Sequence, residues 1–200
     1  MTTHDLTEHF PVRHDHLQRL HARLERAAQA SGLLDIAYRT VDSAVGPLLL
    51  AATPQGLLRV AFANEGLDLV LQNLSERISP RMLEAPTRLD PIARQLDEYF
   101  TRRRHSFDVA LDWSLSHGFR RTVLEHLATD VTYGDTASYA TLARLSGSPK
   151  AVRAVGTACA TNPIPIVVPC HRVIRSDGTV GSYRGGAAAK RALLDLERDR

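Results

Sequence analysis

A chain of 200 residues, 44% of them hydrophobic, is long enough to bury one large core or two small ones, which excludes a largely disordered protein. Two cysteines exclude a disulfide framework, and no apolar run reaches the length of about 20 residues that spans a bilayer. No secretory leader is evident. We therefore expect a globular protein of the reducing cytoplasm.

The first 32 residues are predicted to form a helical extension that ends at Ser31-Gly32. Its apolar side chains recur at roughly helical spacing, at Phe10, Leu17, Leu20 and Leu24. The extension also carries five histidines, His4, His9, His14, His16 and His21. No cysteine accompanies them and their spacing fits no ligand motif, so we interpret them as solvated side chains and predict no metal.

Residues 33–112 are predicted to form a small α+β domain. Short apolar runs at residues 36–41, 48–52 and 57–62 are separated by turn residues, which is typical of an antiparallel meander. Helical spacing follows over residues 67–78 and 92–100, and residues 107–111 fit one more strand.

Residues 113–200 are predicted to form a mostly helical domain. Apolar stripes predict helices over residues 119–128 and 139–145, and a third helix that Ser148 caps and Pro149 opens. Two short helices joined by a turn that contains glycine look like a helix-turn-helix, although many helical hairpins share this pattern.

Positive charge is concentrated in this second half. The net charge of the chain is +3, but no acidic residue occurs between Asp135 and Asp177, and that window carries +5, so the remainder carries −2. The positive residues are Arg144, Lys150, Arg153, Arg172 and Arg175. Such a window indicates a polyanion such as nucleic acid, or, more simply, solvated helix surfaces.

Cys170 ends an apolar stretch between Pro169 and His171. A thiol is a strong nucleophile only as the thiolate, so a neighbouring imidazole and nearby arginines are the environment that a reactive cysteine needs. Cys159 is interpreted as a packing residue, with a chance disulfide to Cys170 as the alternative.

Linked motifs over residues 119–197 resemble the O6-alkylguanine-DNA alkyltransferase family in order and spacing. They are Tyr133-Gly134-Asp135-Thr136 with Ser138-Tyr139, Pro149-Lys150-Ala151 with Arg153-Ala154-Val155-Gly156, Asn162-Pro163 before Pro169-Cys170-His171-Arg172, Gly181-Ser182-Tyr183-Arg184-Gly185-Gly186, and Lys190-Arg191-Ala192-Leu193-Leu194-Asp195-Leu196-Glu197. A match at the cysteine alone is modest evidence, whereas the linked set is specific. Residues 36–62 are compatible with the smaller N-terminal domain of that family.

The resemblance implies direct DNA repair without a cofactor. Cys170 would take the alkyl group from O6-alkylguanine in double-stranded DNA as a thioether, in one irreversible turnover. His171 would act through a water molecule and be oriented by Glu197. If the segment is extended, neighbouring side chains point to opposite sides, which also favours a water between Cys170 and His171.

The remaining roles also follow from the resemblance. Tyr139 would donate to the departing guanine, and Asn162 would tie the helix-turn-helix to the active-site turn. Arg153 would fill the stack after the base is flipped out, with the helix lying in the minor groove largely independently of sequence. Ala151 would permit close approach, and Lys150 and Arg175 would touch phosphates. The substrate pocket would be formed by Val173, Tyr183, Arg184 and Gly185. The protein would act as a monomer.

The chain departs from the family pattern at a few positions. Leu124 stands where many relatives carry tryptophan, and Asp130-Val131 replaces a common isoleucine-proline. Arg184 occupies a variable loop position, which leaves the size of the accepted alkyl group open. The zinc-binding cysteine cluster of the larger regulatory fusions is absent, so we predict repair without a transcriptional switch.

Two other functions fit parts of the sequence. A lesion-sensing helix-turn-helix module would bind DNA without alkyl transfer, but such proteins lack the reactive cysteine that Cys170 supplies. A cysteine hydrolase would also need Cys170 and His171 and would turn over an ester, but no oxyanion loop is evident.

Overall fold

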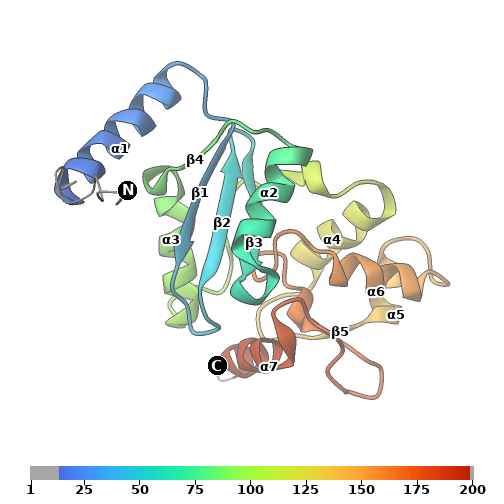
Figure 1. Cartoon of the computed structure of the whole chain (residues 1–200). Helices are drawn as coiled ribbons and strands as arrows, with labels where there is room; N and C mark the ends of the chain where they lie inside the picture. The colour runs from blue at the N-terminus through green and yellow to red at the C-terminus, as the bar shows by residue number, and fades with distance from the viewer. Residues whose placement is uncertain (1–13, 199–200) are drawn as a thin grey trace, which may run out of the picture.

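The computed structural model describes residues 14–198 (Figure 1). The helices are α1 (His14–Ala30), α2 (Leu67–Arg77), α3 (Pro86–Phe100), α4 (Gly118–Asp130), α5 (Tyr139–Leu145), α6 (Val152–Ala160) and α7 (Gly186–Arg198). The strands are β1 (Ile36–Val41), β2 (Leu48–Thr53), β3 (Gly56–Phe62), β4 (Met82–Glu84), β5 (Ala137–Ser138) and β6 (Val173–Ile174). Short 3-10 helices are η2 (Ala63–Glu65), η3 (Trp113–Leu115) and η4 (Cys170–Arg172).

The N-terminal extension is helical from His14 onward, as predicted, whereas His4, His9 and Phe10 lie outside the described residues. Three leucines of α1 stay about half exposed, Leu17, Leu20 and Leu24. No helix in the described part of the chain is long and apolar enough to cross a membrane.

A four-stranded sheet in the order β3-β2-β1-β4 is the centre of the N-terminal region. The predicted meander is confirmed, because β1 pairs with β2 and β2 with β3 in antiparallel fashion. β4 was not predicted; it adds to β1 in parallel, so the sheet is mixed. Its three residues are too few to show a period in the sequence.

The strand predicted at residues 107–111 is wrong. This segment makes a single bridge, between Leu111 and Leu57. The backbone of Asp108 is instead paired with a side chain: the Gln95 amide donates to Asp108 O at 2.9 Å and accepts from Asp108 N at 2.8 Å. Backbone groups paired in this way are not available for a ladder.

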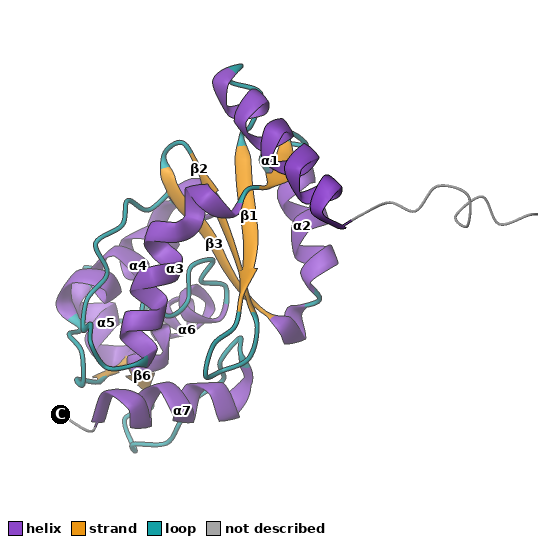
Figure 2. Cartoon of the chain, turned by 90° about the vertical axis from the view of Figure 1, so that its left-hand side faces the viewer, coloured by secondary structure: helices purple, strands orange, loops and turns teal. Residues whose placement is uncertain are grey.

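The sheet is buried on both faces, which explains why its strands read as continuous apolar runs. All six residues of β2 are buried. Leu48 and Leu50 face a core shared with α3 and the C-terminal helices, while Leu49 packs with Leu74 of α2. Helices α2 and α3 therefore lie on opposite faces of the sheet (Figures 1 and 2).

Helix α3 begins at Pro86, six residues before the predicted start at residue 92. Pro91 lies inside the helix and looks like a breaker in the sequence. It is tolerated near the N-terminus, where it removes one intrahelical bond, because Leu89 and Ile92 on either side are buried in the core.

In the C-terminal region the three predicted helices are present, and α4, α5 and α6 pack together. The expected cap at the third helix is wrong: Ala151 N donates to Ser148 O at 2.8 Å, so a turn precedes α6, which begins at Val152 without a side-chain cap. A serine does cap α5, where Ser138 Oγ accepts from Thr141 N at 3.0 Å. The two-residue pairing of β5 with β6 joins this region to the chain that follows Cys170.

Candidate active site

Cys170 lies at the start of the 3-10 helix η4 and is 2% exposed. Asn162 holds it there through three bonds. Its Nδ2 donates to Val168 O at 2.8 Å and to Cys170 Sγ at 3.1 Å, and its Oδ1 accepts from Ile164 N at 3.0 Å. Asn162 thereby links the chain after α6 to the turn that carries the thiol.

The segment around Cys170 is not extended, so the expectation of side chains pointing to opposite sides does not apply. In η4, His171 points to the buried carboxylate of Glu197, and its Nε2 lies 2.8 Å from Glu197 Oε1. Because an ionised carboxylate only accepts, Nε2 carries the proton and Nδ1 keeps its lone pair. Nδ1 is buried and has no partner among the described residues.

Glu197 is surrounded by donors. Tyr99 OH donates to Oε1 at 2.6 Å, and Arg172 donates to Oε2 from Nε at 2.8 Å and to Oε1 from Nη2 at 3.0 Å. Burial by itself would raise the pKa of Glu197, but the hydrogen bonds from His171 and Arg172 outweigh it and hold the pKa well below its usual range. Glu197 is therefore ionised, and the pKa of His171 is lowered by burial despite this neighbour.

Burial raises the pKa of the Cys170 thiol to about 11, although the Asn162 hydrogen bond and the charge of Lys190 act in the opposite direction. At neutral pH the sulfur is therefore a thiol and needs a base when it reacts. Burial likewise lowers the pKa of Lys190, whose Nζ donates to Val173 O at 2.6 Å. Lys190 has no exposed surface, and Val173 is buried beside it.

Tyr139, the first residue of α5, is half-buried, and burial raises the pKa of its hydroxyl. Gly181 passes close to this hydroxyl: a Cβ on Gly181 would lie 2.5 Å from the phenol oxygen. Tyr139 and Arg175 line one hollow of about 270 Å³ together with Val152 of α6. The structure thus brings Tyr139 and Arg175 together at the start of the two short helices.

The loop formed by Tyr183, Arg184 and Gly185 is attached to the N-terminal region. The rings of Tyr183 and Phe62 meet edge to face with centroids 5.5 Å apart, and a Cβ on Gly185 would lie 2.7 Å from the Phe62 ring. Arg184 Nε forms an ion pair with Glu65 at 3.2 Å. The hydroxyl of Tyr183 is buried without a partner among the described residues.

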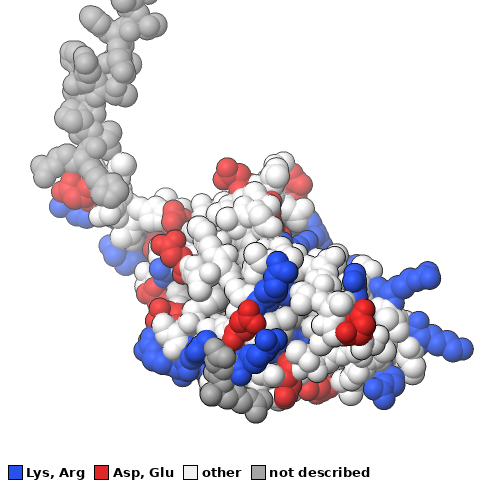
Figure 3. All heavy atoms as spheres, turned by 90° about the horizontal axis from the view of Figure 1, so that it is seen from below, with Lys and Arg blue, Asp and Glu red and all other residues white. Residues whose placement is uncertain are grey.

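The other candidate DNA contacts lie on the surface. Lys150 and Arg153 are exposed, and Ala151 is partly exposed in the turn before α6. Figure 3 shows Lys and Arg side chains projecting at the end of the molecule where α5 and α6 lie. No group of three or more His, Cys, Asp or Glu residues in the described chain is arranged to hold a metal ion.

Three residues of the site were missed or given no role from the sequence. Lys190 lies on an amphipathic helix, where a lysine is typical of the solvent side. Arg172 was placed in the cysteine motif and counted as a positive charge, but its buried pairing with Glu197 leaves no mark in the sequence. Tyr99 comes from a helix 98 residues before Glu197, and no local pattern predicts that pairing.

Two family models match the chain and together cover most of it. The ribonuclease-like domain of 6-O-methylguanine DNA methyltransferase matches residues 36–113, and the DNA binding domain of the same family matches residues 118–199. The chain belongs to the 6-O-methylguanine DNA methyltransferase family. The resemblance predicted from the linked motifs is thereby confirmed.

Individual members are similar along most of their length. The methylated-DNA–protein-cysteine methyltransferase of Mycobacterium tuberculosis is 39% identical over 165 residues, which span 82% of this chain and 94% of that protein. The human protein of that name is 38% identical over 164 residues, 79% of this chain and 78% of its own. The enzyme class of the present chain is thus that of the methylated-DNA–protein-cysteine methyltransferases.

Solved structures of the family share the fold. The M. tuberculosis protein in complex with DNA matches with a TM-score of 0.69 at 39% identity, covering 81% of this chain and 92% of that one. The α+β class predicted from the sequence, with a sheet in the N-terminal part and helices after it, is confirmed.

Proposed function

We propose that this member of the 6-O-methylguanine DNA methyltransferase family repairs double-stranded DNA by moving the alkyl group of O6-alkylguanine to Cys170. The observation that carries the proposal is a buried thiol held by Asn162 and followed directly by a histidine bonded to an ionised glutamate. DNA as the partner is supported by the structure of the M. tuberculosis relative in complex with DNA.

The reaction is a displacement at carbon. Cys170 Sγ bonds to the alkyl carbon while the bond between that carbon and guanine O6 breaks, with the electron pair leaving on the guanine. The thiol proton passes through a water molecule to His171 Nδ1, which keeps a free lone pair because Nε2–H is bonded to Glu197. Glu197 fixes this tautomer and stabilises the imidazolium that forms.

The departing guanine gains negative charge and needs a donor. The Tyr139 hydroxyl supplies it from α5, and the raised pKa keeps this phenol protonated. Val173, Tyr183 and Gly185 form the pocket for the base beside Cys170, and Arg184 holds the covering loop to Glu65. The Tyr183 hydroxyl, which is buried without a partner in the described chain, is available for a polar group of the base.

The alkyl carbon is hidden inside a duplex, so the nucleotide is flipped out at a cost of a few kcal/mol. Arg153, exposed near the start of α6, fills the vacated stack from the minor groove, and Ala151 permits close approach. Lys150 and Arg175 neutralise phosphates, so binding is largely independent of sequence. We also propose that the chain acts as a monomer, because a single chain supplies the nucleophile, the base and the donor that the reaction needs.

The product is a thioether, and none of the assigned residues removes it, so each molecule reacts once. The reaction consumes a reduced thiol, and Cys159 and Cys170 are both free, which supports a cytoplasmic location. Incubation with a methylguanine oligonucleotide should add one methyl group per chain, located on the peptide that contains Cys170. Cys170→Ala should abolish the gain and Cys159→Ala should preserve it, whereas repeated turnover would contradict the proposal.

A further inference from the structure

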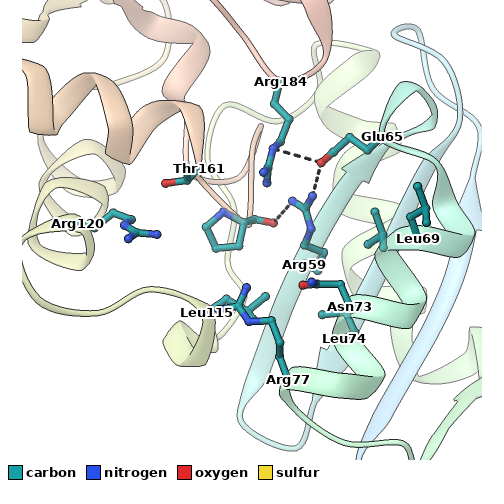
Figure 4. A pocket seen from close by; sticks show the side chains of 12 residues that line it. Arg59, Glu65, Leu69, Asn73, Leu74, Arg77, Leu115, Arg120, Thr161 and Arg184 are labelled. Atoms are coloured by element: carbon teal, nitrogen blue, oxygen red, sulfur yellow. Dashed lines mark hydrogen bonds and ion pairs between the residues drawn. The ribbon is translucent and has the colours of Figure 1, made fainter.

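A cleft of about 400 Å³ lies between the N-terminal region, which holds the sheet, and the helical C-terminal region (Figure 4). α2 forms one side, and the start of α4 and the chain after α6 form the other. Its lining includes four guanidinium groups, Arg59, Arg77, Arg120 and Arg184, and one carboxylate, Glu65. The charged side chains of the cleft therefore sum to +3 at neutral pH.

Among the described residues, only two of these arginines have an ion-pair partner, and they share it. Glu65 forms ion pairs with both Arg59 and Arg184. Arg59 is further bound by the carbonyl oxygens of Val60 and Pro163, each 2.9 Å from Nη1. The guanidinium groups of Arg77 and Arg120 face the cleft from opposite sides, and neither has a hydrogen-bond or ion-pair partner among the described residues (Figure 4).

The start of α4 adds to this positive potential. Arg120 lies in the first turn of the helix, where the helix dipole already disfavours a cation. His117 at the N-cap gives no side-chain cap, and the first turn holds no acidic residue. The backbone N–H groups of this turn and the guanidinium of Arg120 are thus without the negative partner that such a helix end usually has.

We propose that this cleft binds a phosphate group through Arg77 and Arg120. Planar guanidinium groups match the oxygens of phosphate in bidentate fashion, and two of them on opposite walls can bind one dianion. A phosphate group reaches this protein from two sources, free in solution or as part of a DNA backbone. The free-phosphate source does not depend on the proposed function, whereas the DNA source does.

Occupation of the cleft also bears on the active-site loop. Arg184, which follows Tyr183 directly, is held by Glu65 at the edge of the same cleft. A bound phosphate attracts Arg184 and Arg59 and repels Glu65, so it competes with the ion pair that holds the loop.

The first experiment measures thermal unfolding of the full chain in inorganic phosphate and in chloride at equal ionic strength. Phosphate at ten times its Kd should raise the Tm by about 4 °C. Arg77→Ala/Arg120→Ala should remove this rise, and Arg23→Ala/Arg26→Ala should preserve it. The control removes the same charge from exposed positions of α1. Because Arg77 and Arg120 are exposed and unpaired in the described chain, the variant should keep its Tm in chloride.

The second experiment measures the salt dependence of binding to duplex DNA, with Cys170→Ala in all proteins. If the phosphate belongs to DNA, Arg77→Ala/Arg120→Ala should reduce the slope of log K against log salt by about 1, while the α1 control leaves it unchanged. A phosphate effect without a change in slope assigns the cleft to free phosphate. If the cleft variant keeps both the Tm rise in phosphate and the wild-type salt slope, the proposal is overturned. If the proteins do not bind DNA at all, that result instead contradicts the proposed function.

Discussion

The hydroxyl of Tyr99 donates a 2.6 Å hydrogen bond to Glu197 Oε1, the same oxygen that His171 Nε2 contacts at 2.8 Å. Tyr99 belongs to α3, on the sheet, while Glu197 lies in α7 at the other end of the chain. The N-terminal region therefore supplies one of the hydrogen-bond donors to the carboxylate that orients the histidine.

Tyr99→Phe should move the acid limb of alkyl transfer to higher pH. Without the phenol donor, the negative charge of Glu197 acts more fully on His171, so the pKa of His171 rises and Nδ1 is protonated at a higher pH. We expect a displacement of about 0.5–1 pH unit in the rate of transfer, measured from pH 5 to 8.

Tyr133→Phe is the matched control for this substitution. The Tyr133 hydroxyl donates to the backbone oxygen of Leu196 at 3.2 Å. Leu196 precedes Glu197 in the chain, so this hydroxyl is bonded close to Glu197 but not to its carboxylate. Each variant loses one phenol hydroxyl, and its free energy of unfolding should fall by about 1 kcal/mol. Only Tyr99→Phe should change the pH profile. Equal displacement in the two would show that Tyr99 acts only through the fold.

Glu197→Gln should weaken the dependence of stability on acid. The folded pKa of Glu197 lies below its ordinary value of 4.5, so its contribution is complete above that pH and is lost as the pH falls toward the folded pKa. Urea unfolding from pH 6 to 3 should show a slope that is shallower by up to about 1.4 kcal/mol per pH unit in the variant.

The same variant should be less stable at pH 7 by about 3–5 kcal/mol, because Arg172 then lacks its buried partner. Asp195→Asn, on the exposed side of the same helix, should change neither the stability at pH 7 nor the acid slope appreciably. An unchanged slope in Glu197→Gln would show that another group controls the acid transition.

Residues of the site that share a motif could be predicted from the sequence, and their tertiary partners could not. Asn162, Cys170 and His171 lie within ten residues of one another, and Glu197 ends the last motif, so the family resemblance could assign each of them a role. The partners of the glutamate depend on packing between distant elements. Tyr99 is joined to Glu197 by the burial of α3 and α7 against one core, which no periodicity records.

The same limit applies to the fold. The meander of β1, β2 and β3 follows from local turn residues, whereas β4 exists only because β1 offers it an edge in parallel register. Lys190 shows the reverse case: a lysine on an amphipathic helix typically faces solvent, yet this one donates to Val173 O in the interior. In both cases, the structure depends on pairing between residues that are far apart in the sequence.

Asn162→Ala should slow alkyl transfer and destabilise the fold. The variant leaves Val168 O and Ile164 N without their partner, which should cost about 2–4 kcal/mol in urea unfolding. It also removes the N–H donor at Cys170 Sγ, so the pKa of the thiol rises above about 11. Iodoacetamide should therefore alkylate Cys170 at pH 8 more slowly than in wild type, as measured by the mass of the peptide that contains Cys170.

A stability loss alone should not change the thiol. Leu127→Ala, a fully buried core substitution in α4, should destabilise the protein by a similar or larger amount. Under conditions where both variants stay folded, it should leave the iodoacetamide rate of Cys170 unchanged. A slower rate in both would show that the thiol responds to general loosening and not to the Asn162 hydrogen bond.

Arg153→Ala should impair transfer from duplex DNA while leaving transfer from free alkylguanine unchanged. Free base needs no extrusion, whereas a paired base is flipped at a cost of a few kcal/mol that an inserted side chain offsets. A loss of about 100-fold is expected with the duplex, measured as single-turnover rates at saturating protein. Arg144→Ala, which removes an exposed charge from α5, should lower both rates little. Equal losses with duplex and free base in Arg153→Ala would show that this arginine does not assist flipping.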